Sequence, residues 1–444
     1  MTPNATARPS TPAAAAAAAQ CTDAALRILR RLLRGFGGGA DLRLWNDTCH
    51  SMGEGPPAFT LVLRDPQLLR RLVMARGPVP LADAYFRNQI DFEGDLYSAL
   101  ALKGHFEALS LNWRDKLSIW MDVRKLPSHG LTEALGTRLG RWAQTFSGQH
   151  TRQSDRQAIA FHYNVSNEFY GLWLDERRVY SCAYFRSDSD SLDQAQRNKL
   201  EHVCRKLRLR PEERLLDIGC GWGALVCWAA QHHGVQAHGI TLSQAQYDYA
   251  CQRVAELGLQ ARVTIELRDY RDLQGQAVYD KVSSIGMFEH VGLANMATYL
   301  KVVNRVLRPG GLFLNHGITH DEEGWNPTVA SEFINRYVFP DGELDCVSNI
   351  QLGMERAGFE IQDVEALRRH YALTLRHWVR RLESNREQAM REVDEPTYRI
   401  WRLYMAACAL EFEAGGTGIY QILASRKGAE TTLPMTRDDL CATP

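Results

Sequence analysis

The chain has 444 residues, of which 45% are hydrophobic and 23% are charged, and its 52 lysines and arginines are balanced by 52 aspartates and glutamates. This length predicts two or three domains, and the ordinary composition excludes a collagenous, disulfide-dense or wholly disordered protein. A formal net charge of zero makes a general nucleic-acid binder a poor candidate, because such proteins use long-range positive charge.

The ten cysteines are scattered singly, without the C-x-x-C pairs of a zinc site or the spacing of a disulfide framework. We therefore expect a reducing, cytoplasmic compartment and no metal site. No run approaches the roughly 20 apolar residues that a membrane span needs. The stretch Ala13–Ala19 also lacks the basic leader and apolar centre of a signal peptide. Any association with a membrane is therefore expected to be peripheral.

The N-terminal region is expected to be a disordered tail followed by a helix. Residues 1–20 are rich in Ala, Pro and Thr, which bury too little side chain to offset the entropy of ordering. Thr22 or Asp23 is predicted to cap a helix whose apolar side runs from Ala25 to Phe36. Its polar side carries Arg27, Arg30, Arg31 and Arg34. This basic amphipathic helix either docks on the protein's own core, which we favour, or lies on an anionic membrane.

A small domain is predicted to continue to about Arg124. Glycines at 35–39 should end the helix, and Leu42–Leu44 and Phe59–Leu63 are predicted strands. The basic and aromatic stretch Trp113–Lys125 is either a half-exposed connecting helix, which we favour, or an interfacial surface. Polar residues Ser147–Gln157 predict a boundary. The predicted organisation is a tail at 1–20, an N-terminal domain with its linker at 21–150, a second domain at 151–430 and a C-terminal tail at 431–444.

In the second domain short apolar strands alternate with helices. The predicted strands are 214–218, 235–240, 263–267, 281–285 and 312–315, and the predicted helices are 224–233, 243–257 and 296–307. Such alternation builds a parallel sheet with helices on both faces, and its ligands bind at the carboxyl ends of the strands. We therefore predict an α/β, Rossmann-like domain preceded by the smaller N-terminal domain.

The sharpest motif is LLDIGCGWGA at residues 215–224, where alternate glycines let the backbone turn tightly and approach a ligand. Gly219, Gly221 and Ala224 also satisfy the dinucleotide pattern. A dinucleotide enzyme should carry an acid at the end of the second strand, but that strand ends in Gly-Ile-Thr at 239–241. The acid, Asp217, instead precedes the glycines. This arrangement resembles motif I of the class I S-adenosylmethionine-dependent methyltransferases, and we favour that cofactor over a nicotinamide.

Six further blocks point to a narrower family. They are FHYNVSNEFY at 161–170, YSCAYF at 180–185, GMFEHVG at 286–292, HGI at 316–318, HYALTLRHW at 370–378 and YMAAC at 404–408. Together they closely resemble the cyclopropane-fatty-acyl-phospholipid synthase family, which includes the mycolic acid cyclopropane synthases. The resemblance covers roughly residues 161–427. Before it, only DFEGDL at 91–96 matches the longer phospholipid-acting bacterial enzymes.

The resemblance implies a set of cofactor contacts. Tyr180 and Ser181 are placed near the methionine end, the glycine loop against the backbone, residues 241–246 along the ribose, and Asp269 and Tyr270 at the adenine. The amide of Gln246 is expected to replace the ribose-binding acid, because it can both donate and accept hydrogen bonds. The implied cofactor-binding residues are Tyr180, Ser181, Asp217, Gly219, Cys220, Gly221, Gly223, Thr241, Leu242, Ser243, Gln246, Asp269 and Tyr270.

The resemblance also implies the reaction and its catalytic residues. The cis double bond of an acyl chain attacks the sulfonium methyl, and the resulting carbocation closes to a ring when the new methyl loses a proton to a bound bicarbonate. The family's bicarbonate holders map onto the main chains of Cys182 and Ile318 and the side chains of Glu289, His316 and Tyr371. Cys408 matches a family cysteine often assigned to the active site, and His162 and His290 are expected beside it. Taken alone, Cys182 is typical of a small buried hydrophobe and Glu289 of a helix N-terminal carboxylate.

The expected function is therefore methylene transfer from S-adenosylmethionine to an unsaturated phospholipid by a cytoplasmic enzyme, peripheral on the inner face of the membrane. Nucleic acid is not an expected partner, and a homodimer is left open. The alternatives within the family are a methyl-branched or methylene-branched acyl chain and N-methylation of a small amine. The segment FPDGEL at 339–344 also matches the family, but Asp345 and Cys346 follow where Pro-Ser is usual.

Overall fold

The computed structural model describes residues 12–74, 79–127, 165–323, 343–430 and 433–441. The chain divides into two compact units: unit 1 comprises Met1–Gly136 with Glu395–Ile400, and unit 2 comprises Thr137–Asp394 with Trp401–Pro444. The boundary predicted at 147–157 lies outside the described residues. Sequence reasoning did not anticipate that a six-residue segment from far along the chain belongs to unit 1.

Unit 1 is built on a four-stranded sheet with the order β2-β1-β3-β4. The strands are β1 (Gly39–Arg43), β2 (Cys49–Gly53), β3 (Pro57–Leu63) and β4 (Ile90–Gly94). Its helices are α1 (Pro12–Leu32), α2 (Pro66–Met74), α3 (Val79–Phe86), α4 (Leu96–Leu100), α5 (Leu102–Ala108) and α6 (Trp113–Val123). The central pair β1 and β3 is parallel, whereas β2 and β4 join antiparallel at the edges. The strands expected near Leu42 and Phe59 are thus present as β1 and β3.

Helix α1 begins earlier than the sequence patterns predicted. It starts at Pro12, so the expectation of a disordered tail through residue 20 is wrong for residues 12–20. The physical reason is the run Ala13–Ala19, because alanine has the best intrinsic helix propensity. Thr22 does not cap the helix: its hydroxyl donates within the helix to the Ala18 carbonyl at 3.2 Å.

The basic amphipathic helix α1 docks on unit 1 itself. Its apolar residues Ala24, Ile28 and Leu29 are buried. Arg27 and Arg31 of this helix, and Arg34 just beyond its end, meet the two acids of α6, with Arg27 on Asp122 at 3.0 Å. The other pairs are Arg31 with Asp122 at 3.3 Å, and Arg31 and Arg34 with Asp115 at 3.8 and 3.3 Å. The interpretation that this helix packs against the core is therefore confirmed.

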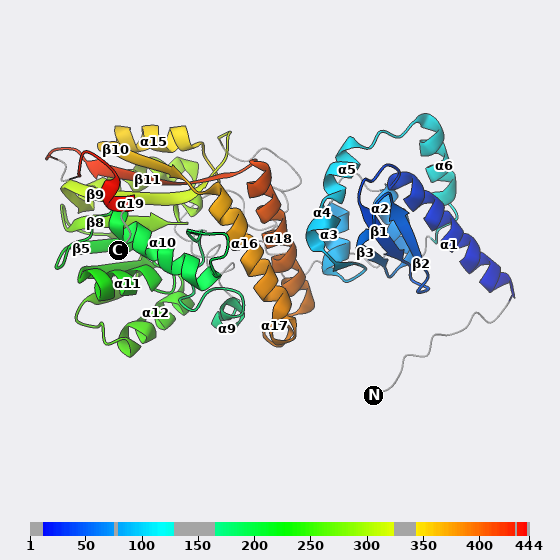
Figure 1. Cartoon of the computed structure of the whole chain (residues 1–444), viewed down its shortest axis with the longest axis horizontal. Coiled ribbons are helices and arrows are strands. Elements are labelled where there is room, and N and C mark those ends of the chain that lie inside the picture. Colours follow the sequence, from blue (N-terminus) through cyan, green and yellow to red (C-terminus); the bar gives the residue numbers. More distant parts are fainter. Residues whose placement is uncertain (1–11, 75–78, 128–164, 324–342, 431–432, 442–444) are drawn as a thin grey trace. The chain divides into compact units, whose positions relative to one another are not determined.

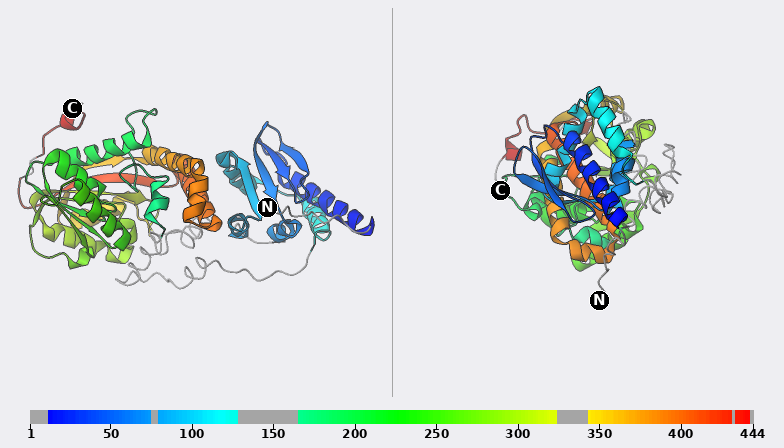
Figure 2. Two further views of the ribbon diagram at one scale, coloured as in Figure 1. Left: turned by 90° about the horizontal axis from the view of Figure 1, so that it is seen from below. Right: turned by 90° about the vertical axis from the view of Figure 1, so that its right-hand side faces the viewer.

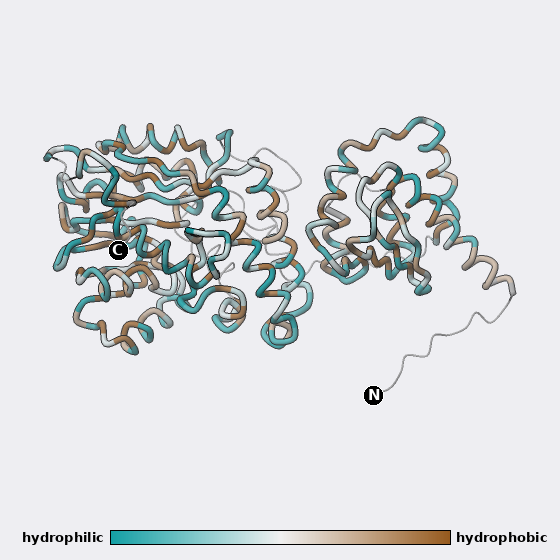
Figure 3. Tube along the Cα trace, viewed as in Figure 1, coloured by the Kyte–Doolittle hydropathy of each residue, from teal (hydrophilic) through white to brown (hydrophobic). Residues whose placement is uncertain are grey.

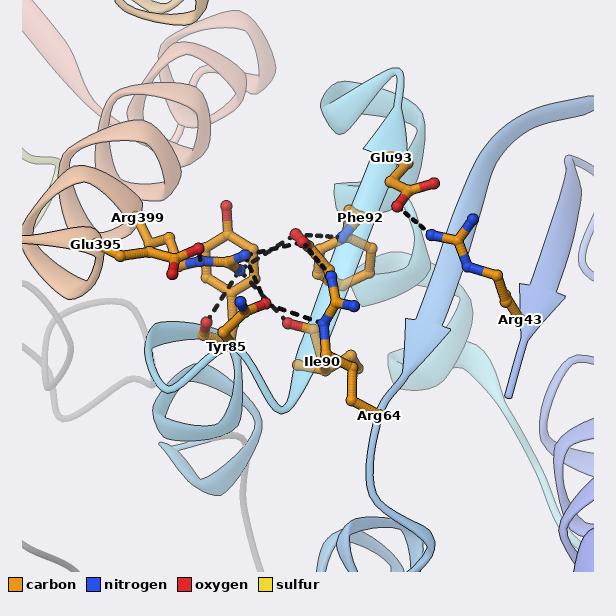
Figure 4. Close-up of polar contacts among 10 residues, drawn as sticks. Arg43, Arg64, Tyr85, Ile90, Phe92, Glu93, Glu395 and Arg399 are labelled. Carbon is orange, nitrogen blue, oxygen red and sulfur yellow. Dashed lines mark hydrogen bonds and ion pairs between the residues drawn. The ribbon is translucent and has the colours of Figure 1, made fainter. Parts of the chain in front are cut away.

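Arg399 ties the last segment of unit 1 to strand β4 (Figure 4). It lies in the first turns of α18 (Glu395–Ala414) and is buried. Its guanidinium donates to both carboxylate oxygens of Asp91, at 3.1 and 2.8 Å, and to the side-chain oxygen of Asn88 at 2.8 Å. Burial alone would raise the pKa of Asp91, but hydrogen bonds from Arg399 and Arg64 hold that pKa below its usual value. Asp91 opens the DFEGDL segment, so one function of that segment is to hold this arginine.

Unit 2 contains a seven-stranded sheet with the order β10-β11-β9-β8-β5-β6-β7. The strands are β5 (Arg214–Ile218), β6 (Gln236–Thr241), β7 (Val263–Leu267), β8 (Tyr279–Ile285), β9 (Leu307–Thr319), β10 (Phe359–Ala366) and β11 (Gly418–Arg426). The five strands from β9 to β7 are parallel, and β11 and β10 extend the sheet antiparallel. The predicted α/β fold with a parallel-rich sheet is confirmed. The last predicted strand, 312–315, is only the centre of β9.

Helices cover both faces of this sheet, as can be followed in Figures 1 and 2. They are α9 (Asn167–Gly171), α10 (Leu192–Lys206), α11 (Ala224–His233), α12 (Gln244–Glu256), α13 (Met296–Val306), α15 (Val347–Arg356), α16 (Arg368–Ser384), α17 (Arg386–Glu392), α18 and α19 (Asp438–Cys441). Adjacent residues Leu215 and Leu216 enter different cores, because successive strand side chains point to opposite faces. The first core includes α10, α11 and α12, and the second includes α13 and α15.

The C-terminal segment predicted as a tail is in part attached to unit 2. Asp439, in α19, pairs with Arg208 at 3.0 Å, and Leu433 packs against the core. These contacts could not be read from the local composition, because Arg208 lies more than two hundred residues from Asp439 and the core that Leu433 joins is formed by several distant segments. None of the described helices combines enough length with enough apolarity to pass through a lipid bilayer.

Candidate active site

The glycine loop lies between β5 and α11. Gly219, Gly221 and Gly223 all have positive φ, at 80°, 55° and 83°, which residues with a Cβ rarely adopt. The amides of Gly219 and Cys220 both donate to the Ile240 carbonyl at 2.9 Å, which fixes the loop against β6. A Cβ at Gly221 would meet nothing within 4 Å. The loop therefore presents bare backbone to open space at Gly221.

A cavity lies where this loop meets the ends of β5, β6 and β8. Most of the predicted cofactor residues line it: Tyr180, Ser181, Asp217, Gly219, Cys220, Gly221, Thr241, Leu242, Gln246 and Tyr270. His290, which was expected beside the site, lines it as well. The structure thus brings together residues from segments as distant as Tyr180 and His290.

Three residues of the predicted set do not reach the cavity wall. Gly223 packs behind the loop, where an added Cβ would lie 3.1 Å from the Cβ of Ala250. The hydroxyl of Ser243 caps α12 by accepting from the Gln246 amide. The carboxylate of Asp269 is held by Arg271, whose Nη2 lies 2.6 Å from Oδ2. Each of the three is a chain neighbour of residues that line the cavity, and its role in binding the cofactor stays a prediction.

Thr241 and Gln246 form a hydrogen-bonded pair at the end of β6. Both are buried, and the threonine hydroxyl donates to the amide oxygen of Gln246 at 2.8 Å. This pair occupies the position where a dinucleotide enzyme places its ribose-binding acid. The side chain of Gln246 is thereby held at the cavity without any negative charge.

Sequence reasoning missed Lys199, which lines the same cavity. Its ammonium donates to the Ser181 hydroxyl at 3.0 Å. Burial lowers the pKa of Lys199 to about 8, against the opposing effect of Asp217. One signal in the sequence could have identified Lys199: it lies on the apolar face of α10, next to Leu200 and one turn after Ala195. Lysine is almost never fully buried without a partner.

Asp217 supplies the matching negative charge. Burial raises its pKa to about 6, and the Ser283 hydroxyl, 2.6 Å from Oδ1, and Lys199 both oppose that rise. Between pH 6 and pH 8 one wall of the cavity therefore carries a carboxylate and an ammonium together. Such a pair of opposite charges is complementary to an α-amino acid zwitterion.

A second cluster joins Glu289 to β9. Oε1 of Glu289 accepts the Ile318 amide at 2.8 Å, whereas Oε2 is buried and has no hydrogen-bond partner among the described residues. Burial raises the pKa of Glu289 to about 7. His316, two residues before Ile318, has Nδ1 3.3 Å from Nε2 of Gln421, and its own Nε2 is again buried without a described partner. Burial lowers the pKa of His316 well below its ordinary value, so the imidazole is neutral.

Cys182 and Tyr371 both lie against Leu367. The Cys182 sulfur is 3.8 Å from the Leu367 carbonyl, which also accepts the Tyr371 amide at 3.1 Å. The Leu367 amide in turn donates to Ile419, the residue opposite Ile318 in the β9–β11 ladder. These contacts connect Ile318 of β9 to Tyr371 of α16 by way of Ile419 and Leu367.

The thiols at the site are not activated. Burial raises the pKa of Cys182, and it raises the pKa of Cys408 to about 12. Cys408 lies one turn after Tyr404 on α18. At neutral pH neither cysteine is a thiolate, so neither can act as a nucleophile without a further change. His162 and residues 339–342 of the FPDGEL segment lie outside the described residues.

Aromatic rings fill the space around Tyr180. The ring of Tyr180 lies 5.3 Å from that of Trp378 and 5.5 Å from that of Trp173, measured between centroids. Trp378 contacts Tyr371 in turn, at 6.0 Å. These rings exclude water and present negative π faces, so they favour a transient positive charge. The six sequence blocks contain Tyr180, Tyr371 and Trp378 but not Trp173, and only the fold shows that these aromatics form one cluster.

Comparison with known proteins places this site in a family. The family described as mycolic acid cyclopropane synthetase matches residues 150–422. The chain belongs to this family. Its members are S-adenosylmethionine-dependent lipid methyltransferases. The match spans the described part of unit 2 from α9 into β11 and includes Glu395–Ile400 of unit 1, but it leaves the N-terminal part of unit 1 outside.

Curated relatives extend the similarity of this cyclopropane synthetase family member beyond unit 2. A probable fatty acid methyltransferase of Pseudomonas putida is 41% identical over 405 residues, which are 90% of this chain and 95% of that protein. The cyclopropane-fatty-acyl-phospholipid synthase of Escherichia coli K12 is 38% identical over 276 residues, or 62% of this chain and 69% of that protein. Unit 1 is therefore shared with at least one fatty acid methyltransferase.

Solved structures agree with the family and its class I methyltransferase fold. The cyclopropane synthase MmaA2 of Mycobacterium tuberculosis has a TM-score of 0.58 at 28% identity, covering 63% of this chain and all of that one. The mycolic acid cyclopropane synthase CmaA1, solved in complex with SAH and CTAB, has a TM-score of 0.58 at 31% identity, covering 61% of this chain and 98% of that one.

Proposed function

We propose that this protein transfers a one-carbon unit from S-adenosylmethionine to the cis double bond of an unsaturated phospholipid acyl chain and closes a cyclopropane ring. The single observation that carries the proposal is that Oε2 of Glu289 and Nε2 of His316 are both buried and have no hydrogen-bond partner among the described residues. Native proteins rarely leave such atoms unsatisfied, so they suit a site that receives a proton or a small anion during the reaction.

The cavity residues fit the proposed cofactor. Lys199 would meet the carboxylate of its amino-acid end, and Asp217 would meet the ammonium, while the open backbone at Gly221 admits close approach. When bound, S-adenosylmethionine supplies an electrophilic methyl group on a sulfonium. A relative at 31% identity is known in complex with SAH, which supports this assignment.

The aromatic cluster around Tyr180 suits an alkene acceptor. An alkene is a weak and neutral nucleophile, so the protein must hold it close to the methyl donor and keep water away. The buried rings of Trp173 and Trp378 meet the second requirement. They also stabilise the positive charge that develops on the acyl chain when the new carbon–carbon bond forms.

Closing the ring requires loss of a proton from the new methyl group. Glu289, with its pKa near 7, and neutral His316 can share or accept that proton at neutral pH. They are also the residues that would hold a bicarbonate ion as the proton acceptor, together with Tyr371 and the main chain of Cys182. The Ile318 amide already donates to Glu289, so it would reach such an ion only if Glu289 turned away.

A branched product is the second candidate. The tuberculostearic acid methyltransferase UfaA1 of Mycobacterium tuberculosis is 32% identical over 95% of this chain and 94% of its own length. The same carbocation gives a methylene branch when a hydride moves to the cationic carbon before the methyl group loses its proton. Both routes use one methyl donor and release one proton, and they differ in whether a hydride shifts to the cationic carbon before the proton is lost.

The experiment incubates the full chain with methyl-labelled S-adenosylmethionine and vesicles that contain an oleoyl phospholipid. Mass spectrometry of the acyl chain and proton NMR then show whether one CH2 unit was added and whether a ring or a methylene branch formed. Vesicles of a saturated phospholipid are the matched control and should take up no label. Absence of label from the oleoyl chain would refute the proposed function, and a methylene branch would select the second candidate.

A further inference from the structure

The outer face of helix α6 in unit 1 exposes four large hydrophobic side chains. Trp113 is 69% exposed, Leu117 47%, Trp120 45% and Met121 48%. At about 100° per residue these four positions fall within an arc of about 100° on the helix. They therefore form one continuous apolar stripe, which we call the α6 stripe. The alternation of hydrophobic and hydrophilic residues along α6 can be followed in Figure 3.

The opposite side of α6 is already satisfied within unit 1. Ile119 and Val123 are buried there, and Asp115 and Asp122 are bonded to the arginines of α1. No acid therefore remains exposed on this helix. Arg27, Arg31 and Arg34 are paired by the same contacts, whereas Arg30 of α1 remains exposed.

Basic residues border the α6 stripe. Arg114, Lys116 and Arg124 are exposed, and Lys125 is exposed but pairs with Asp122 at 3.1 Å. The guanidinium of Arg124 lies 3.4 Å from the ring centroid of Trp120, and that of Arg114 lies 5.4 Å from the ring of Trp113. Indole rings with neighbouring cations are typical of the boundary between an apolar phase and water. The face combines an apolar stripe with positive charge and carries no exposed negative charge.

We propose that the α6 stripe docks unit 1 on the surface of an anionic phospholipid bilayer. Tryptophan and leucine enter the headgroup boundary, and the flanking cations meet lipid phosphates. A second copy of this chain is disfavoured, because a symmetric contact through the stripe would place Arg114, Lys116 and Arg124 against the same three cations of the other copy. The inference rests on the proposed function in one respect: it names the surface through which the enzyme meets its lipid.

The test measures binding of the full chain to vesicles by cosedimentation. Vesicles of phosphatidylcholine mixed with an equal amount of phosphatidylglycerol should bind the protein, and pure phosphatidylcholine should bind it far more weakly. Trp113→Ser with Trp120→Ser should lower affinity about a hundredfold, since two indoles lose their apolar contact. Arg114→Gln with Arg124→Gln should lower it about twenty-five-fold, at about fivefold per removed charge.

The matched control is a surface of the same chemistry in unit 2. Leu352 is 43% exposed on α15, and Arg356 is exposed one turn later. Leu352→Ser with Arg356→Gln should leave vesicle binding unchanged. Methyl transfer to the same oleoyl lipid dispersed in neutral detergent micelles should be equal in all variants, because dispersed lipid needs no bilayer docking.

Several results would overturn the proposal. Equal binding to neutral and anionic vesicles would remove the charge argument, and wild-type affinity in the Trp113 and Trp120 variant would remove the stripe. A wild-type dimer in sedimentation velocity that the stripe variant splits would instead make this face a contact between copies. If no protein methylates dispersed lipid, the proposed function fails, while the vesicle data still decide the docking surface.

Discussion

Replacement of Lys199 by methionine tests the charge pair at the cofactor cavity. The two side chains have similar length, but the variant lacks the ammonium that donates to Ser181 at 3.0 Å. A charge-assisted hydrogen bond contributes about 2 kcal/mol, which corresponds to about a thirtyfold weaker affinity for S-adenosylhomocysteine at pH 7. Isothermal titration calorimetry measures this without any need for turnover.

The pH profile of binding gives a sharper criterion. In the native protein, affinity should be highest between pH 6 and pH 8, because Asp217, with its pKa near 6, protonates below that range and Lys199, with its pKa near 8, loses its proton above it. In Lys199→Met the alkaline decline should vanish. The acidic decline should move to higher pH, because Asp217 loses the cation that opposes the effect of burial.

Lys206→Met is the matched control, since it removes a second buried lysine two turns further along α10. Lys206 pairs with Asp363 and Glu365 and does not line the cavity. It should lower the unfolding temperature and leave affinity for S-adenosylhomocysteine unchanged. The reasoning is wrong if Lys199→Met binds with native affinity and profile, or if both variants lose affinity equally.

Three further changes probe other parts of the molecule. Glu289→Gln should reduce methyl transfer by about a hundredfold or more and leave S-adenosylhomocysteine affinity unchanged in calorimetry, because it removes a proton acceptor and not a cofactor contact. Gly221→Val should abolish that affinity through its positive φ while hydrogen exchange in β1 and β3 stays native; normal binding would contradict the loop assignment. Arg399→Met should leave the buried side of Asp91 without its cation. The hydrogen-exchange protection of β4 should then fall by about 3 kcal/mol. Unchanged protection would show that the Arg399–Asp91 pair contributes nothing to stability.

Local sequence was sufficient wherever a short stretch dictates its own conformation. The strands at 214–218 and 263–267 and the helix at 224–233 have the predicted bounds, because apolar runs between clear turn residues leave few alternatives. The glycine loop was predictable for the same reason: positive φ at three alternate positions demands glycine. The start of α1 was predicted wrongly, because the small side chains of the alanine run were taken to indicate disorder although alanine has a high helix propensity.

Contacts between distant segments could not be predicted in this way. Nothing near Lys199 in sequence indicates that its ammonium reaches Ser181, and nothing near Arg399 indicates Asp91 as its partner. Asp269 had the expected position after β7, but only the structure shows that its carboxylate is bonded to the neighbouring Arg271, which lines the cavity. The α6 stripe could likewise be identified only from the structure, which shows that Arg27 and Arg34 pair with the two acids on the other side of α6.

The sequence by itself determined the order of the strands along the chain, the glycine turn, the family and the set of polar and aromatic residues available to the site. The tertiary structure alone decided which of these residues become buried and lose contact with solvent. Burial depends on packing between segments that lie hundreds of residues apart, and it is burial that brings the pKa of Glu289 to about 7 and that of Asp217 to about 6. The chemistry proposed here depends on those two shifts, which no local pattern encodes.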